Sequence, residues 1–167
     1  EPSGVSYGTI VCAKQLVLIG PGFKLGLPNG NPDLQANSEM ATVNRIQLDA
    51  GSEGTVIYGL RIDYANSSSE INVNVSGIII EGNFFDGTQV YFASNSILSV
   101  SNVLIHGNYF DGANAVVQYS NSTVRSYNNI QITNNYFEDG GVDLDDGTTA
   151  MSNCTVAFNV FNSDGNN

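Results

Sequence analysis

A phrase that recurs about every 25 residues constrains this chain more than any other feature of its sequence. Residues 78–87 read IIIEGNFFDG, residues 103–112 read VLIHGNYFDG, and residues 130–140 read IQITNNYFEDG. A fourth and weaker copy starts at Cys154, so successive copies start 25, 27 and 24 residues apart. A fixed period in this range is typical of chains that stack similar structural repeats rather than of a closed globule.

Equivalent positions of the four copies carry the same kinds of side chain. If each copy is one coil of a parallel β-solenoid, equivalent residues lie about 4.8 Å apart along its axis. We then expect an inward apolar column, a ladder of asparagine amides, and a stack of phenylalanine rings in one corner. We expect the ladder asparagines to take left-handed turn geometry, and the following glycines to take a positive φ. These columns are Ile80, Ile105, Ile132 and Val156; Asn83, Asn108, Asn135 and Asn159; Phe85, Phe110, Phe137 and Phe161; and Gly87, Gly112, Gly140 and Gly165.

The composition predicts an all-β chain. β-Branched and aromatic runs alternate with Asn, Gly, Ser and Asp, which is typical of many short strands. In the N-terminal half, residues 14–20, 43–48 and 55–62 read as strands, and residues 23–41 read as a long loop. We therefore predict one domain over residues 1–167, a short single-stranded parallel β-helix of about five coils without a capping helix.

These segments resemble a known superfold. The repeats IIIEGNFFDG and VLIHGNYFDG are similar to those of right-handed parallel β-helix proteins of the pectate-lyase-like superfold. The stretch LVLIGPGFKLG, followed by NPDLQAN and AGSEGTVIYGLRI, resembles secreted bacterial β-helix repeat proteins without an assigned activity. The resemblance implies a right-handed coil and an extracellular or cell-surface location. It does not imply an activity, because this fold hosts lyases, hydrolases, epimerases, adhesins and phage fibres.

The charge balance excludes two classes of partner. Five Lys and Arg residues oppose 16 Asp and Glu residues, which gives a formal net charge of −11. Nucleic acids and anionic membrane surfaces both require a basic surface, so we expect neither as a partner. No apolar run approaches 18 residues, so the sequence predicts no transmembrane helix.

The densest acidic run is the candidate for metal binding or chemistry. Strand alternation would place Asp143 and Asp145 on one side of the chain, with Asp146 beside them, and Val142 and Leu144 on the other. Such carboxylates are suited to calcium or to acid–base work on a glycan, and the competing interpretation is a solvated turn. We recognise no catalytic set of residues and predict no other cofactor.

The single histidine and the glycosylation sequons have mainly structural interpretations. The single histidine, His106, falls at an outward position in a column with Glu81, Thr133 and Ala157, so we expect a surface ladder residue. Four N-x-S/T sequons occur, about the number expected by chance, and of these Asn66 and Asn121 lie in Ser-rich loops suited to glycosylation.

Apolar strand-like sequence runs almost to both ends, at residues 9–12 and 154–161, without a helical pattern. A solenoid normally needs capped ends. We therefore expect either head-to-tail stacking of copies or a fragment of a longer β-helix. Cys12 and Cys154 lie too far apart for a disulfide within one copy, but an inter-subunit bond between them is a prediction of the stacked arrangement; the alternative is two buried thiols.

The leading functional hypothesis is a non-enzymatic extracellular structural protein, whose copies stack end to end into a filament or surface assembly. Its partner would then be a second copy of the chain. Two alternatives remain open at this point. One is a carbohydrate-active or carbohydrate-binding β-helix resembling polysaccharide lyases or glycoside hydrolases, and the other is a fragment of a longer adhesin or tailspike.

Overall fold

A computed structural model describes residues 5–22, 40–64, 70–92, 99–112, 116–118, 126–144 and 149–162. It contains 19 short strands in these ranges and no helix, so no described segment is a helix that could cross a membrane. The strands form three sheets, named A, B and C here, and every pairing between strands is parallel. The predicted all-β parallel solenoid is therefore confirmed.

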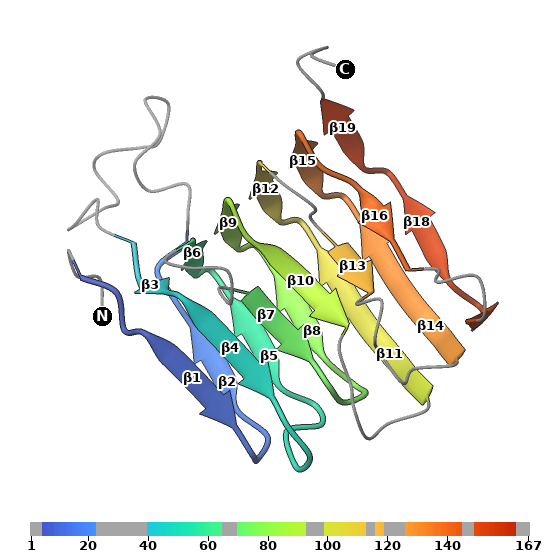
Figure 1. Ribbon diagram of the computed structural model, residues 1–167, viewed down its shortest axis with the longest axis horizontal. Coiled ribbons are helices and arrows are strands. Elements are labelled where there is room, and N and C mark those ends of the chain that lie inside the picture. Colours follow the sequence, from blue (N-terminus) through green and yellow to red (C-terminus); the bar gives the residue numbers. More distant parts are fainter. Residues whose placement is uncertain are drawn as a thin grey trace.

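The chain visits the three sheets in a fixed order, and each passage through A, B and C is one coil (Figure 1). Sheet A contains β1 (Thr9–Cys12), β4 (Arg45–Leu48), β7 (Glu70–Val73), β10 (Gln89–Phe92), β13 (Val116–Gln118) and β16 (Val142–Asp143). Sheet B contains β2 (Val17–Ile19), β5 (Val56–Tyr58), β8 (Ile79–Glu81), β11 (Ser99–His106) and β14 (Ser126–Thr133), with both β17 (Ala150–Ser152) and β18 (Thr155–Ala157) paired to β14. Sheet C contains β3 (Thr42–Val43), β6 (Arg61–Asp63), β9 (Phe84–Asp86), β12 (Tyr109–Asp111), β15 (Tyr136–Glu138) and β19 (Val160–Asn162). Sheets A and C thus hold six strands each, one more than the predicted five coils.

The predicted apolar column lies inside the solenoid. Ile80 pairs with Ile105, and Ile105 with Ile132, and all three side chains are fully buried. Because every coil contributes only a few apolar side chains, no coil could bury its own inner face without a neighbour. The core is therefore continuous from coil to coil along the axis.

The predicted asparagine ladder is confirmed, and it is buried. Nδ2 of Asn83 donates to Oδ1 of Asn108 at 3.1 Å, and Nδ2 of Asn108 donates to Oδ1 of Asn135 at 3.0 Å. Asn135 continues the ladder to Asn159 at 3.0 Å. The same amide groups also donate to backbone carbonyls of the preceding coil, such as Ile80 O at 2.9 Å. These bonds satisfy polar groups that would otherwise be costly inside the core.

The phenylalanine stack fills the adjoining position of sheet C, as predicted. The rings of Phe85, Phe110, Phe137 and Phe161 stack with centroid separations of 4.4, 4.9 and 4.7 Å. The prediction that the ladder asparagines take left-handed backbone geometry is wrong by one position. The residue with positive φ is the one before each ladder asparagine: Gly82, Gly107, Asn134 and Phe158.

The glycines after the repeats follow the prediction only in part. Gly87 and Gly112 have positive φ, but in the third repeat Asp139 takes the left-handed conformation in place of Gly140. Asp tolerates this geometry better than most residues, because its short polar side chain can bond locally. Gly165 lies outside the described residues.

Candidate functional surfaces

The last coil leaves its inward side chains uncovered. Val156 pairs with the buried Ile132 but is 52% exposed, and Phe161 pairs with the buried Phe137 but is 53% exposed. Met151 pairs with the buried Tyr127 and is also half-exposed. We name these three side chains, Met151, Val156 and Phe161, the C-terminal face. They form the end of the apolar core, and no described residue packs on them beyond the last coil.

Strand edges at this face are also unpaired. Within the described ranges, β16 pairs only with β13, β17 and β18 only with β14, and β19 only with β15. A free parallel edge presents backbone N–H and C=O groups that can pair with another strand. The C-terminal face therefore combines exposed apolar side chains with the unpaired edges of β16, β17, β18 and β19. These strands lie at one end of the solenoid (Figure 1).

The first coil is covered less evenly. On sheets A and B, the inward residues Ile10, Leu16 and Leu18 pack against the core but are only partly buried. On sheet C, Val43 is fully buried, and the backbone N–H of Tyr7 donates to Thr42 O at 2.9 Å. In the parallel register of this sheet, that bond places Tyr7 beside Val43. Tyr7 therefore extends the same inward column that ends at Phe161.

The two cysteines lie in different columns. Cys12 ends β1 with its side chain buried, and Cys154 precedes β18, in the column of Ile130 and Val103. Both are free thiols, and five coil steps separate them by roughly 24 Å. Burial raises the pKa of the Cys12 thiol, and the nearby Asp49 carboxylate raises it further, so little reactive thiolate forms.

A register-preserving stack does not bring these cysteines together. The column of Val56 and Val17 continues to Thr155, so Leu16 of a following copy is the residue that would face Cys154. Cys12 lies four residues earlier, around the corner between sheets A and B. The inter-subunit disulfide remains a prediction, and the geometry favours two free thiols.

The acidic run has the predicted alternation, as far as the structure describes it. Asp143 is exposed on the outer side of sheet A, and Leu144 beside it is buried. Asp145 and Asp146 lie outside the described residues, so calcium binding there remains a prediction. In the described ranges, no three His, Cys, Asp or Glu side chains converge into a metal site. The proposed glycosylation sites Asn66 and Asn121 also lie outside those ranges.

His106 is a surface ladder residue, as its outward position predicts. It pairs with Glu81 on one side and Thr133 on the other, and its Nδ1 lies 3.0 Å from Thr133 Oγ1. The contact joins the fourth and fifth coils on the outer side of sheet B.

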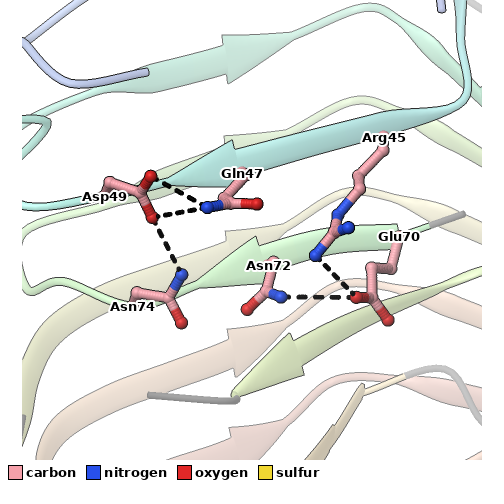
Figure 2. Close-up of polar contacts among 6 residues, drawn as sticks. All are labelled: Arg45, Gln47, Asp49, Glu70, Asn72 and Asn74. Carbon is pink, nitrogen blue, oxygen red and sulfur yellow. Dashed lines mark hydrogen bonds and ion pairs between the residues drawn. The ribbon is translucent and has the colours of Figure 1, made fainter. Parts of the chain in front are cut away.

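A polar cluster on the outer side of sheet A was not predicted from the sequence (Figure 2). Glu70 on β7 is 7% exposed, forms an ion pair with Arg45 at 3.6 Å, and accepts a hydrogen bond from Asn72 Nδ2 at 3.3 Å. Burial raises the pKa of Glu70, and the opposing effect of the Arg45 charge is smaller. Nearby, Asp49 accepts hydrogen bonds from Gln47 Nε2 at 2.8 and 2.9 Å and from Asn74 Nδ2 at 3.3 Å.

This cluster joins the second and third coils across their outer side. Figure 2 shows the amide oxygens of Asn72 and Asn74 turned away from the carboxylates, and neither oxygen has a hydrogen-bond partner among the residues that the structure describes. A signal for the cluster exists in the sequence: Arg45 and Glu70 are 25 residues apart, the period of the repeat. That spacing places them side by side on adjacent strands.

The outer side of sheet C carries an aromatic column beside a carboxylate column. The aromatic column is Phe84, Tyr109 and Tyr136, and the carboxylate column is Asp63, Asp86, Asp111 and Glu138. The rings of Tyr109 and Tyr136 stack at 5.1 Å, so these two rings cover each other's faces.

Charges interact along the carboxylate column. Arg61 forms an ion pair with Asp86 and a longer one, at 3.7 Å, with Asp63. Burial raises the pKa of Asp111, and the neighbouring carboxylates, first Glu138 and then Asp86, raise it further. Tyr109 donates its hydroxyl hydrogen to Glu138, and this bond raises the pKa of the tyrosine.

No protein-family model matches this chain, and the comparisons with curated proteins and with solved structures found no match.

Proposed function

We propose that this chain is a non-enzymatic structural protein whose copies associate end to end through the C-terminal face. The supporting observation is a difference in exposure between residues of the same column. Val156 and Phe161 are half-exposed, whereas Ile132 and Phe137, one coil earlier in the same columns, are fully buried. One further coil would cover both side chains and pair the free strand edges.

Sheet B supports a second copy as the occupant. In the shared register, β18 would lie on β2 of the next copy, with Val156 against Leu18. Leu18 is itself only partly buried, so both sides of the contact would lose apolar exposed area. Head-to-tail contacts of this kind repeat without closing, which gives a filament.

Sheet C adds a condition to this arrangement. Within each copy, Tyr7 lies beside Val43. Strand β19 of the preceding copy would take the same position, because Phe161 and Tyr7 extend the same column. Assembly therefore exchanges the contact of Tyr7 for that of β19. Such an exchange of one strand for another is the principle of donor-strand pairing.

Apolar burial at this contact is comparable to the cost of association. Covering the exposed halves of Met151, Val156 and Phe161 contributes roughly 3 kcal/mol, since full burial of such side chains is worth about 1.5–3 kcal/mol each, and the partly buried side chains of the facing coil add to this. Association costs an estimated 4–15 kcal/mol or more in lost freedom of motion. Pairing of the strand edges must therefore supply most of the net affinity, and we expect assembly to depend on concentration.

Electron microscopy and analytical ultracentrifugation over a concentration series test the proposal. Six coils per copy predict a filament with an axial repeat of about 29 Å per copy. Single particles at all concentrations up to millimolar would refute self-association, and they would indicate that a different partner, such as a further coil of a longer chain, covers the face.

Two finer elements of the proposal are a location outside the cell and membership of the pectate-lyase-like superfold. Both are supported by the resemblance of the repeats to secreted β-helix proteins. Fractionation of a culture that expresses the native gene tests the location.

Glycan binding is the second candidate, and the carboxylate column of sheet C favours it. Asp86 and Asp111 lie in register on adjacent strands, beside tyrosine side chains, and carboxylates are suited to accept hydrogen bonds from sugar hydroxyls. Binding to a glycan array that is lost in the variant Asp86→Asn with Asp111→Asn would support this function. Unchanged binding in that variant would exclude this column as the site.

A further inference from the structure

Phe158 combines two unfavourable properties in one residue. Its φ is +59°, in the left-handed region, and its side chain is 84% exposed. The other described residues with positive φ are glycine, asparagine or aspartate, which accept this geometry more readily. A bulky residue in a strained conformation, without burial that compensates for it, is characteristic of a functional contact rather than of a stable fold.

The residues equivalent to Phe158 in the preceding coils are asparagine or glycine. Ala157 pairs with Thr133, so Phe158 lies in the column of Asn134, Gly107 and Gly82. All four residues have φ between 55° and 63°. The turn therefore keeps the same conformation in the last coil, and only the side chain differs.

The same column begins at Gly20. Ile19 pairs with Tyr58, and Tyr58 pairs with Glu81, which places Gly20 and Gly59 in the column of Gly82. In a register-preserving stack, the residue facing Phe158 is thus Gly20 of the next copy. Beside it lies Ile19, whose side chain is 70% exposed on the outer side of sheet B.

The molecule already contains a related contact. The ring of Tyr58 lies over Gly82 of the following coil, so close that a Cβ added to Gly82 would be 3.1 Å from the ring. An aromatic ring at this corner therefore packs where the next coil has a glycine. The counterpart of Tyr58 in the last coil is Ala157, so Phe158 would bring its ring to the glycine of the next copy from one position later in the turn.

We infer that Phe158 is the anchor of the end-to-end contact, and that its ring packs against Gly20 and Ile19 of a second copy. This inference rests on the proposed function and names the partner surface. The occupant is a second copy because the surface facing Phe158 in the shared register has both a glycine without a side chain and an exposed aliphatic neighbour.

A double-mutant cycle tests the inference. Phe158→Asn uses the residue that the same column accepts at Asn134, and Ile19→Ser removes the aliphatic neighbour. Each variant should raise the dissociation constant for association about tenfold, measured by sedimentation. The double variant should also have a dissociation constant only about tenfold above that of the wild type, rather than about a hundredfold. Such non-additivity requires contact, and within one copy these residues lie five coils apart.

Controls separate this inference from the proposed function. Tyr64→Ser removes another exposed aromatic residue, 58% exposed, from the second coil and should leave association unchanged. Phe158→Asn should also raise the melting temperature of the monomer, because it relieves the strained turn. Association of the wild type with no effect of Phe158→Asn would overturn the inference and leave the proposed function standing. Absence of association in the wild type would overturn both.

Discussion

Asn108 donates two hydrogen bonds to one oxygen atom: its Nδ2 lies 3.0 Å, and its backbone N lies 2.9 Å, from Oδ1 of Asn135. The Oδ1 of Asn108 receives the same pair of bonds from Asn83. Each buried asparagine therefore connects three consecutive coils, since its Nδ2 also reaches a carbonyl of the preceding coil.

Replacement of Asn108 by alanine should destabilise the protein by about 3 kcal/mol. The change leaves the backbone N–H of Asn83 and the carbonyl of Ile80 buried without these partners, at roughly 1–3 kcal/mol for each unsatisfied group. Urea unfolding measures the effect. Asn159→Ala is the matched control in the last coil, where the ladder is only partly buried, and it should cost about 1 kcal/mol. Equal losses in the two variants would contradict the role of burial.

Replacement of Phe110 by alanine should cost about 4 kcal/mol. Its ring is fully buried between those of Phe85 and Phe137, so truncation removes apolar contacts on both faces and leaves a cavity. The control is Phe161→Ala, which removes a half-exposed ring with one stacking neighbour and should cost roughly 1 kcal/mol in the monomer. Denaturation of dilute protein, where no association occurs, distinguishes the two values.

Glu70→Gln should raise the urea midpoint at pH 8 and have less effect at pH 4. The pKa of Glu70 is raised above its ordinary value of 4.5, chiefly by burial, so the folded state binds this proton more tightly than the unfolded state. Wild-type stability is therefore lost as the pH rises from about 4.5 through the raised folded pKa. Glutamine keeps the acceptor for Asn72 Nδ2 without the buried charge.

The matched control for this pH dependence is Glu81→Gln, which changes an outward and less buried glutamate on sheet B. A rise in the urea midpoint at pH 8 that this variant shares with Glu70→Gln would come from the lower net charge of the protein rather than from the buried carboxylate. A variant Glu70→Gln that is less stable than the wild type at pH 8 would show that the ion pair with Arg45 outweighs the cost of burying the carboxylate.

Tyr7→Ser should promote end-to-end association about fivefold. Tyr7 holds the position beside Val43 that β19 of another copy would take. Its half-buried ring stabilises this position of Tyr7 by roughly 1 kcal/mol, which the incoming strand must displace. Sedimentation equilibrium measures the change in the dissociation constant. Weaker association of the variant would mean that Tyr7 is itself part of the contact.

The middle of the fold was predictable because stacking demands the same side chain at the same place in each coil. Asn83, Asn108 and Asn135 differ in their loops but share one environment, so the 25-residue period identifies them directly. The second coil lacks this signal. There Leu60 and Ile62 occupy the positions of Asn83 and Phe85, and the periodic phrase is absent.

The candidate surfaces were harder to predict, for a physical reason. The pairing of Glu70 with Arg45 has only its 25-residue spacing as a signal, because the strands that carry these residues lie outside the repeated phrase. The strain at Phe158 depends on a backbone angle. The sequence instead assigned the left-handed turn to the asparagine that follows. Side-chain identity alone does not separate two adjacent residues of a tight turn when glycine and asparagine both occur there.

The asparagine ladder has a consequence for how such a molecule can change in size. Each ladder amide reaches no farther than the coils directly before and after it, so the positions from Asn83 to Asn159 are equivalent to one another. Duplication or loss of one 25-residue segment would leave every remaining amide with an equivalent neighbour. The length of the rod can therefore vary in whole-coil increments, by genetic events that leave its cross-section unaltered.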